Sequence, residues 1–333
     1  MLKFIRNLIL LAVLAATMLG GGFAWNVFSP IRLESTPVEF NIVPGSGLRS
    51  VARQISEAGA PVHPWVFIAL GKLLRVEASV KAGSYEISSG MTPLLLMEKL
   101  TRGDVTQTDI AFIEGWTFRQ MRERLDAHPE IRHDSRGLSE AEILQKIGAA
   151  ENRAEGLFFP DTYLLAKRSS DLEVLARAYR AMQRHLAREW AGKAAGLPYR
   201  EPYQALVMAS IVEKETGREA DRPLVAAVFT NRLRQGMLLQ TDPTVIYGVG
   251  EKFDGNLRKR DLLADTPYNT YLRSGLPPTP IAMPGLASLQ ATLHPVDSQV
   301  LYFVARGDGS SQFSRTLDEH NQAVNRYQRG AKR

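Results

Sequence analysis

The chain has 333 residues, of which 44% are hydrophobic and 23% charged, with a formal net charge of +6. These proportions are typical of a folded protein, and the length allows two globular units in addition to a membrane segment. The sequence has no cysteine, which excludes structural disulfides, cysteine-bound metal, a thiol nucleophile and a lipid-modified N-terminal cysteine. The positive charge favours an anionic partner, but lysine and arginine are scattered rather than clustered, which argues against nucleic acid.

The first predicted element is a transmembrane helix. Lys3 and Arg6 precede a stretch from Asn7 to Ile31 that contains no charged side chain. Roughly 20 helical residues cross the hydrocarbon core of a bilayer, so this stretch is long enough. The positive charges before the span favour a cytoplasmic N-terminus, and Trp25 near the other end is typical of a membrane interface. We therefore expect residues 1–32 to form a cytoplasmic tip and one membrane span.

A cleaved signal peptide is the alternative interpretation of this segment. Gly22-Phe23-Ala24 offers small residues at the spacing that a signal peptidase reads. Both interpretations place the body of the protein outside the cytoplasm, where ATP and NAD are poor candidates for cofactors. The phosphate-binding patterns G-x-x-x-x-G-K-[ST] and G-x-G-x-x-G are also absent from the sequence.

Three segments share a pattern that predicts a strand, a glycine turn and an amphipathic helix. Their glycines are Gly45, Gly90 and Gly115. Apolar residues stand five and three positions before each glycine, which is strand spacing, and six and ten positions after it, which suits a buried helical stripe. Thr92 and Thr117 follow their glycines by two positions, where a hydroxyl group can cap the coming helix.

The first two of these units resemble a carbohydrate-binding module of the LysM type, although ordinary α/β packing explains the same pattern. We expect a small LysM-like β-α module over residues 33–108, followed by a larger, mostly helical domain with a few strands over residues 109–333. The predicted fold class is therefore α+β, with an N-terminal transmembrane helix.

One predicted helix of the larger domain, Pro202–Thr216, carries charge where apolar residues belong. Its apolar stripe includes Met208 and Ile211, and Glu215 continues that stripe at the C-terminal end. A carboxyl group held against an apolar wall loses solvation, which raises its pKa and lets it act as a general acid near neutral pH. The alternative is a carboxylate at a frayed helix end that pairs with Arg218 or with Arg222.

Two later segments are rich in hydroxyl, amide and tyrosine groups, which suit a neutral sugar polymer with many hydroxyls and apolar ring faces. Turn formation explains any single one of these residues equally well. The candidate substrate-binding residues are Gln240, Thr241, Asp242, Thr244, Tyr247, Asn269 and Tyr271. The H-E-x-x-H and G-x-S-x-G patterns are absent, so neither a metal site nor a serine nucleophile is expected.

Several runs of the sequence resemble the endolytic murein transglycosylase family, also called MltG or YceG-like. The resemblance rests on five parts of the sequence: Ala209–Thr216, Phe229 with Asn231–Leu233, Leu239–Gly248, Tyr268–Tyr271 and Gly275–Pro278. Further matches are Glu155-Gly156 with Phe159–Tyr163, Leu301–Ala305 and His320-Asn321. The resemblance implies a single-pass inner-membrane protein with its catalytic domain in the periplasm, which cleaves nascent glycan strands of peptidoglycan without a cofactor. It also implies a partnership with peptidoglycan synthases.

The family's catalytic glutamate lies in the Glu-Lys-Glu run. We assign that role to Glu215, which the helical stripe selects independently, and keep Glu213 as the fallback. The expected reaction is lytic: it cleaves the linkage between N-acetylmuramic acid and N-acetylglucosamine and leaves a 1,6-anhydromuramyl end. That route needs one carboxylate, whereas hydrolysis normally uses two, and Asp242 is the nearest candidate for a second. The alternatives are a muramidase-type hydrolase and a non-catalytic, membrane-tethered scaffold that binds peptidoglycan.

Overall fold

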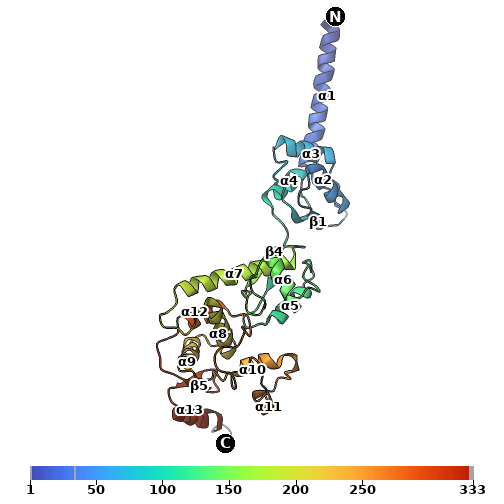
Figure 1. Ribbon diagram of the computed structural model, residues 1–333. Helices are drawn as coiled ribbons and strands as arrows, with labels where there is room; N and C mark the ends of the chain where they lie inside the picture. The colour runs from blue at the N-terminus through green and yellow to red at the C-terminus, as the bar shows by residue number, and fades with distance from the viewer. Residues whose placement is uncertain (1, 34, 330–333) are drawn as a thin grey trace. The chain divides into compact units, whose positions relative to one another are not determined.

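The structure is a computed structural model that describes residues 2–33 and 35–329, and the chain divides into two compact units (Figure 1). Unit 1 consists of the described residues up to Asp109 together with Leu164–Ser169. Unit 2 consists of Ile110–Tyr163 and the described residues from Ser170 onward. Both helices and strands occur, as the α+β prediction requires. Met1, Glu34 and residues 330–333, which the predicted domains include, lie outside the described residues.

Helix α1 (Leu2–Phe28) begins unit 1 and projects from the rest of it (Figure 1). Its segment Lys3–Phe28 is long and apolar enough to cross a membrane, and its apolar side chains are exposed. Only the last turns pack against the rest of the unit, with Val27 3% exposed. The predicted apolar helix is therefore present, with its far end free of protein contacts and its near end anchored in a core.

The remainder of unit 1 is a small two-stranded sheet with helices packed against it. Its elements are β1 (Val38–Ile42), α2 (Leu48–Glu57), α3 (Pro64–Leu73), β2 (Gly83–Ile87) and α4 (Pro93–Arg102). Strands β1 and β2 are antiparallel, and the register places Phe40 opposite Tyr85, with their rings 5.8 Å apart. Helix α3 was not predicted, and it separates the first two strand–turn–helix units.

The three predicted strand–turn–helix units are confirmed. The third consists of β3 (Gln107–Ala111) and α5 (Phe118–Asp126). Gly45, Gly90 and Gly115 have φ angles of 81°, 86° and 76°, a region that favours glycine because it has no Cβ atom. The predicted caps are also present: Thr92 Oγ1 accepts a hydrogen bond from the Leu95 amide, and Thr117 forms a capping box with Gln120.

Strand β3 pairs with β4 (Thr162–Ala166). The segment Leu164–Ser169 belongs to unit 1 and not to the larger domain that the sequence predicts over residues 109–333. Lys167 explains this, because its Nζ lies 2.6 Å from Glu39 Oε1 and its carbonyl oxygen accepts a 2.6 Å hydrogen bond from the Ser84 hydroxyl. The LysM-like character of the module stays a prediction.

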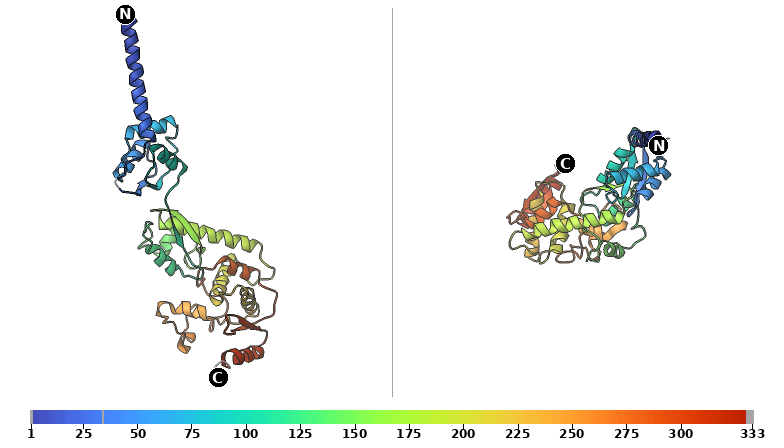
Figure 2. Two further views of the ribbon diagram at one scale, coloured as in Figure 1. Left: turned by 180° about the vertical axis from the view of Figure 1, so that it is seen from behind. Right: turned by 90° about the horizontal axis from the view of Figure 1, so that it is seen from above.

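Unit 2 is mostly helical, as predicted, with one two-stranded antiparallel sheet of β5 and β6 near its C-terminal end. Its remaining elements are α6 (Glu140–Ile147), α7 (Asp171–Ala191), α8 (Pro202–Glu215), α9 (Arg222–Arg234), α10 (Asp242–Val249), η1 (Gly250–Lys252), α11 (Lys259–Leu262), α12 (Leu286–Leu293), β5 (Tyr302–Ala305), β6 (Ser311–Ser314), α13 (Leu317–Val324) and η2 (Asn325–Arg329). The long helix α7 passes beside α12 and α8, as both side views show (Figures 1 and 2).

Helix α8 lies at the centre of unit 2, between α7, α9 and α12. Every residue from Ala205 to Val212 is buried, so this part of the helix is enclosed by the core on all sides. The loop that contains Ile281 packs along it, and the Ile281 amide donates a 3.0 Å hydrogen bond to the Ser210 hydroxyl. On its other side this loop contacts Gly156, where an added Cβ atom would stand 2.3 Å from Pro280 Cβ.

We expect Gly156→Ala to lower the free energy of unfolding of unit 2 by about 2 kcal/mol or more, because it adds a steric clash to the strain of a positive φ angle. Gly255→Ala is the control: Gly255 also has a positive φ angle, but its added Cβ would meet nothing within 4 Å. Urea denaturation of both variants measures the difference. Equal destabilisation would show that the Gly156 contact does not fix this loop against α8.

Candidate active site

Glu215 is the last residue of the buried helix α8, and it lies where the core of unit 2 meets a cleft. The cleft has a volume of about 560 Å³. Its walls come from α8, α9, the segment before α10, β5 and α13, all in unit 2. Most of the side chains that line it are uncharged and aromatic or apolar, including Phe229, Tyr271 and Tyr302.

Burial raises the pKa of Glu215 from its ordinary value of 4.5 to about 7. A smaller effect in the same direction comes from the negative charge of Asp242. A hydrogen bond from the Thr241 hydroxyl to Glu215 Oε1 and the positive charge of Arg232 act in the opposite direction, but desolvation is the larger effect. Near neutral pH a large fraction of Glu215 is therefore protonated, as a general acid requires.

Arg232 of α9 holds both sides of the cleft together. Its guanidinium group donates to the Leu301 carbonyl at 2.7 Å and to the Leu239 carbonyl at 2.8 Å. It also lies over the Tyr302 ring, 5.1 Å from the centroid. Arg232 is only 8% exposed, and these hydrogen bonds hold it to the backbone rather than to a carboxylate. The guanidinium group thus fixes the cleft walls without ion-pairing to the glutamate.

A buried cluster of threonines fixes the segment that faces Glu215. The Thr241 amide donates to Thr270 Oγ1 at 3.1 Å, and the Thr244 hydroxyl donates to the Thr241 carbonyl at 2.8 Å and lies 2.9 Å from Thr270 Oγ1. Gln240, just before this cluster, has a φ angle of 51°, which turns the backbone sharply. These contacts hold the Thr241 hydroxyl in position against the carboxyl group.

The structure brings some of the predicted substrate-binding residues together and not others. Gln240, Asp242 and Tyr271 line the cleft with Glu215, and the Tyr271 hydroxyl donates to Asp242 Oδ1 at 2.6 Å. Thr241 contacts Glu215 but is 1% exposed. The other three do not line the cleft: Thr244 and Asn269 are fully buried, and the Tyr247 hydroxyl donates to Glu155 at 3.0 Å.

The fallback glutamate, Glu213, points elsewhere. Its Oε2 accepts a 2.7 Å hydrogen bond from the Ser288 hydroxyl and a 3.0 Å hydrogen bond from the Gly285 amide at the start of α12. It does not line the cleft of Glu215. Residues two apart on a helix are rotated by about 200°, which explains why the two carboxyl groups have different surroundings. The geometry favours Glu215 as the proton donor.

Among the cleft residues that the sequence analysis does not select are three with polar or charged groups: Arg232, Tyr302 and His320. The imidazole of His320 stacks on Tyr302 with ring centroids 5.3 Å apart, and burial lowers its pKa. All three lie in runs that match the family, and that match is the only sequence signal that could have selected them. Within residues 2–33 and 35–329 no group of three or more His, Cys, Asp or Glu side chains could hold a metal ion.

Residues 40–326 match the model of the YceG-like family, whose members the sequence runs resemble. The chain belongs to this family. The YceG-like chain is 31% identical to the endolytic murein transglycosylase of Bacillus subtilis (strain 168) over 332 residues, which cover 93% of this chain and 91% of that protein. Proteins of the same name from two strains of Streptococcus pneumoniae are 27% identical over 359 residues, which cover 96% of this chain and 64% of each relative.

The fold of this YceG-like chain is similar to that of a YceG-like protein from Listeria monocytogenes, known from a crystal structure at 2.6 Å. The TM-score is 0.54 at 29% sequence identity, and the match covers 86% of this chain and 98% of that chain. The similarity therefore extends over most of the chain rather than over one motif, and the predicted family is confirmed.

We expect Glu215→Gln to stabilise the YceG-like chain at high pH. The pKa of Glu215 is about 7 in the folded state and near its ordinary 4.5 in the unfolded state, so ionisation costs stability as the pH rises through this window. The variant should be more stable by about 2–3 kcal/mol at about pH 9, and this gain should disappear below about pH 4.5. Thermal or urea denaturation across the pH range measures it.

Glu219→Gln is the control, because Glu219 is exposed and shortly follows α8. It should change stability by no more than about 0.5 kcal/mol at any pH. A Glu215→Gln effect that does not depend on pH would mean that the carboxyl group is not desolvated in the folded state.

Proposed function

We propose that this chain is an endolytic murein transglycosylase, which cleaves glycan strands of peptidoglycan internally. The observation that carries the proposal is a single desolvated carboxyl group, Glu215, in a cleft lined mainly by uncharged and aromatic side chains. The family membership and the names of the relatives agree with it. Aromatic faces and hydroxyl groups are suited to sugar rings, which offer apolar faces and many hydroxyls but little charge.

In the proposed reaction, Glu215 donates its proton to the glycosidic oxygen between N-acetylmuramic acid and N-acetylglucosamine. The bond between that oxygen and muramyl C1 breaks, and the oxygen leaves as a hydroxyl group. The muramyl C6 hydroxyl then attacks C1 and gives its proton to the Glu215 carboxylate. The product is a 1,6-anhydromuramyl end, and the glutamate returns to its protonated form.

Asp242 supports this lytic route over hydrolysis. An inverting or retaining hydrolase needs a second carboxylate that activates water or attacks C1. The Asp242 carboxylate instead accepts a 2.6 Å hydrogen bond from the Tyr271 hydroxyl. Its proposed roles are to orient the Tyr271 ring and, through its charge, to help keep Glu215 protonated.

The apolar helix α1 anchors the protein in the cytoplasmic membrane, and the cleft of unit 2 acts outside it in this proposal. The length and composition of α1 support a membrane span, and the positive residues Lys3 and Arg6 support a cytoplasmic N-terminus. Periplasmic location, association with peptidoglycan synthases and sugar binding by the LysM-like module belong to the same proposal.

Glu215→Gln should reduce cleavage of purified sacculi by about 10²–10⁴-fold, because the amide has no proton of suitable acidity to donate. Glu213→Gln is the matched control on the same helix, because its amide oxygen can still accept the hydrogen bonds from Gly285 and Ser288. It should keep most of the activity. Mass spectrometry of the digest should find 1,6-anhydromuramyl ends.

Each other outcome of this assay has a distinct meaning. Reducing ends in place of anhydro ends would identify a muramidase and end the lytic proposal. Full activity of Glu215→Gln together with loss of activity in Glu213→Gln would show that Glu213 is the catalytic acid. If the unaltered chain binds sacculi but cleaves nothing, the protein is the tethered scaffold.

Thr241→Val should shift the alkaline limb of the pH–activity profile upward. Activity falls as the pH rises through the pKa of Glu215, because the acid must be protonated. The Thr241 hydroxyl lowers that pKa by donating to the carboxylate, so its removal should raise the half-maximal pH by about one pH unit. Thr216→Val, next to Glu215 but hydrogen-bonded to the backbone of Arg218, should leave the limb in place. A downward shift in Thr241→Val would contradict the assignment.

A further inference from the structure

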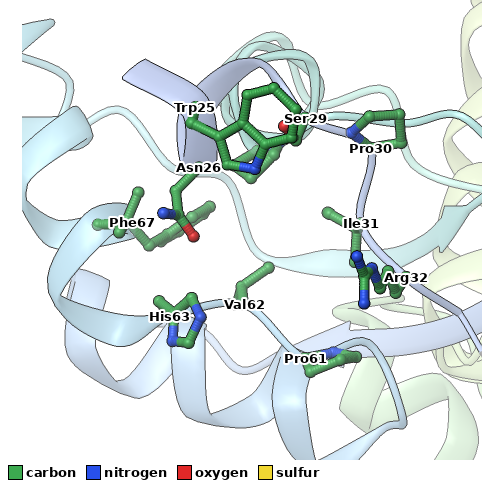
Figure 3. A pocket seen from close by; sticks show the side chains of 12 residues that line it. Trp25, Asn26, Ser29, Pro30, Ile31, Arg32, Pro61, Val62, His63 and Phe67 are labelled. Carbon is green, nitrogen blue, oxygen red and sulfur yellow. The ribbon is translucent and has the colours of Figure 1, made fainter. Parts of the chain in front are cut away.

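Unit 1 contains a cavity of about 630 Å³ at the point where α1 ends (Figure 3). It is lined by the last residues of α1, by the segment that follows it to Arg32, by the loop before α3 and by the first turn of α3. Figure 3 shows Trp25 at the top of the view, Asn26 and His63 in its left half and Arg32 at the right. The cavity has no part in the cleft of unit 2.

The sequence of α1 places this cavity at the outer surface of the membrane that α1 is proposed to span. Arg6 and Trp25 are separated by nineteen positions, which is about 29 Å along a helix and close to the ~30 Å of bilayer hydrocarbon. With Arg6 at the inner boundary, Trp25 therefore lies at the outer one. Trp25 is 75% exposed, and Trp65 of α3 is 58% exposed. Exposed indole rings are typical of the headgroup region.

The position of the cavity relative to α1 is fixed because the end of α1 is part of the core of unit 1. Val27 is 3% exposed and Ile31 is 8% exposed. The Ile31 amide also donates a 2.8 Å hydrogen bond to the Met91 carbonyl. The Phe23 ring lies 6.2 Å from the Trp65 ring, which fixes α3 beside α1. A lipid headgroup next to α1 thus faces a preformed site rather than a loose linker.

The lining of the cavity suits an anion. Arg32 and His63 line it, and no Asp or Glu side chain is among its described lining residues. Within the described residues Arg32 is exposed and makes no hydrogen bond or ion pair, so its guanidinium group is available to a phosphate. The Asn26 amide nitrogen donates to the Gly22 carbonyl, which leaves its oxygen as an acceptor for a ligand hydroxyl.

We propose that this cavity binds the headgroup of an anionic phospholipid of the outer leaflet, with the phosphate on Arg32 and the glycerol hydroxyls towards Asn26. The buried side chains of Val66 and Phe67 also line the cavity and give it an apolar part. The inference goes beyond glycan cleavage and rests on the proposed membrane anchoring through α1. Its consequence is a second attachment to the bilayer, which limits how unit 1 can tilt and rotate about the end of α1.

The test uses the full chain in neutral detergent micelles, supplied with phosphatidylglycerol, with phosphatidylcholine or with inorganic phosphate. A ligand that binds the native state raises the unfolding temperature and can be counted by native mass spectrometry. Phosphatidylglycerol should raise this temperature and remain bound, whereas the other two should not. Arg32→Gln should weaken phosphatidylglycerol retention about tenfold or more, because it removes a charge-assisted contact.

Arg49→Gln is the matched control, since Arg49 is an exposed arginine of α2 in the same unit and does not line this cavity. It should retain phosphatidylglycerol as the unaltered chain does. Equal retention of phosphatidylglycerol and phosphatidylcholine, or undiminished retention by Arg32→Gln, would overturn the inference. If inorganic phosphate raises the unfolding temperature and phosphatidylglycerol does not, the ligand of the cavity is not a lipid.

Failure of this inference can be told apart from failure of the proposals on which it rests. A carbonate wash of membranes tests the anchor: a chain that washes off has no membrane span. Sacculus cleavage by Arg32→Gln tests the reaction separately and should be unchanged, because Arg32 lies in unit 1 and the catalytic cleft in unit 2.

Discussion

The carboxyl group of Glu215 is kept largely out of water because it lies at the end of a helix whose central residues are buried in the core of unit 2. The residues of helix α8 from Ala205 to Val212 are buried and form the centre of unit 2, so Glu215 closely follows a stretch of core. The resulting pKa of about 7 suits a residue that must keep its proton near neutral pH and still reach a substrate. A fully solvated glutamate would be ionised at neutral pH, and a completely sealed one could not reach a substrate.

The elements around the cleft act mainly by keeping this arrangement rigid. Arg232 joins the segment before α10 to β5 through backbone carbonyls, and the buried threonines join that same segment to Thr270. Near the other end of α10, the Tyr247 hydroxyl donates a hydrogen bond to Glu155 Oε2. Glu155 Oε1 accepts a hydrogen bond from the Phe118 amide at the start of α5, so Glu155 links α10 to α5. In the proposed lytic reaction one carboxyl group both donates and accepts the proton, so its position must be fixed by the side chains around it.

Local periodicity in the sequence was enough to predict the strand–turn–helix units, the glycine turns and the helix that carries Glu215. It failed for α3, whose sequence from Pro64 to Leu73 is apolar almost throughout and so has no stripe at helical spacing. It also failed for Leu164–Ser169, because the pairing of β4 with β3 joins segments that are far apart in the sequence. Patterns within a window cannot report on such contacts.

Side-chain chemistry predicted the site less completely than periodicity predicted the fold. Thr244 and Asn269 have the groups that a sugar site needs, but the same groups satisfy buried polar atoms: the Asn269 amide donates to the Leu262 and Ala264 carbonyls. Arg232 was missed for the opposite reason, since an arginine within a helix usually lies in solvent. Whether a polar residue serves the ligand or the backbone depends on tertiary neighbours that the sequence does not reveal.

Glu213 and Glu215 show how strongly the direction of a side chain decides its role. Both are glutamates on the last turn of α8, and only Lys214 separates them. Glu213 accepts hydrogen bonds from the Gly285 amide and the Ser288 hydroxyl and so positions α12, which packs against α8. Glu215 instead accepts a hydrogen bond from the Thr241 hydroxyl and faces the cleft. At the edge of the cleft, burial raises the pKa of Glu215 to about 7. The family motif alone does not distinguish the two, and their surroundings do.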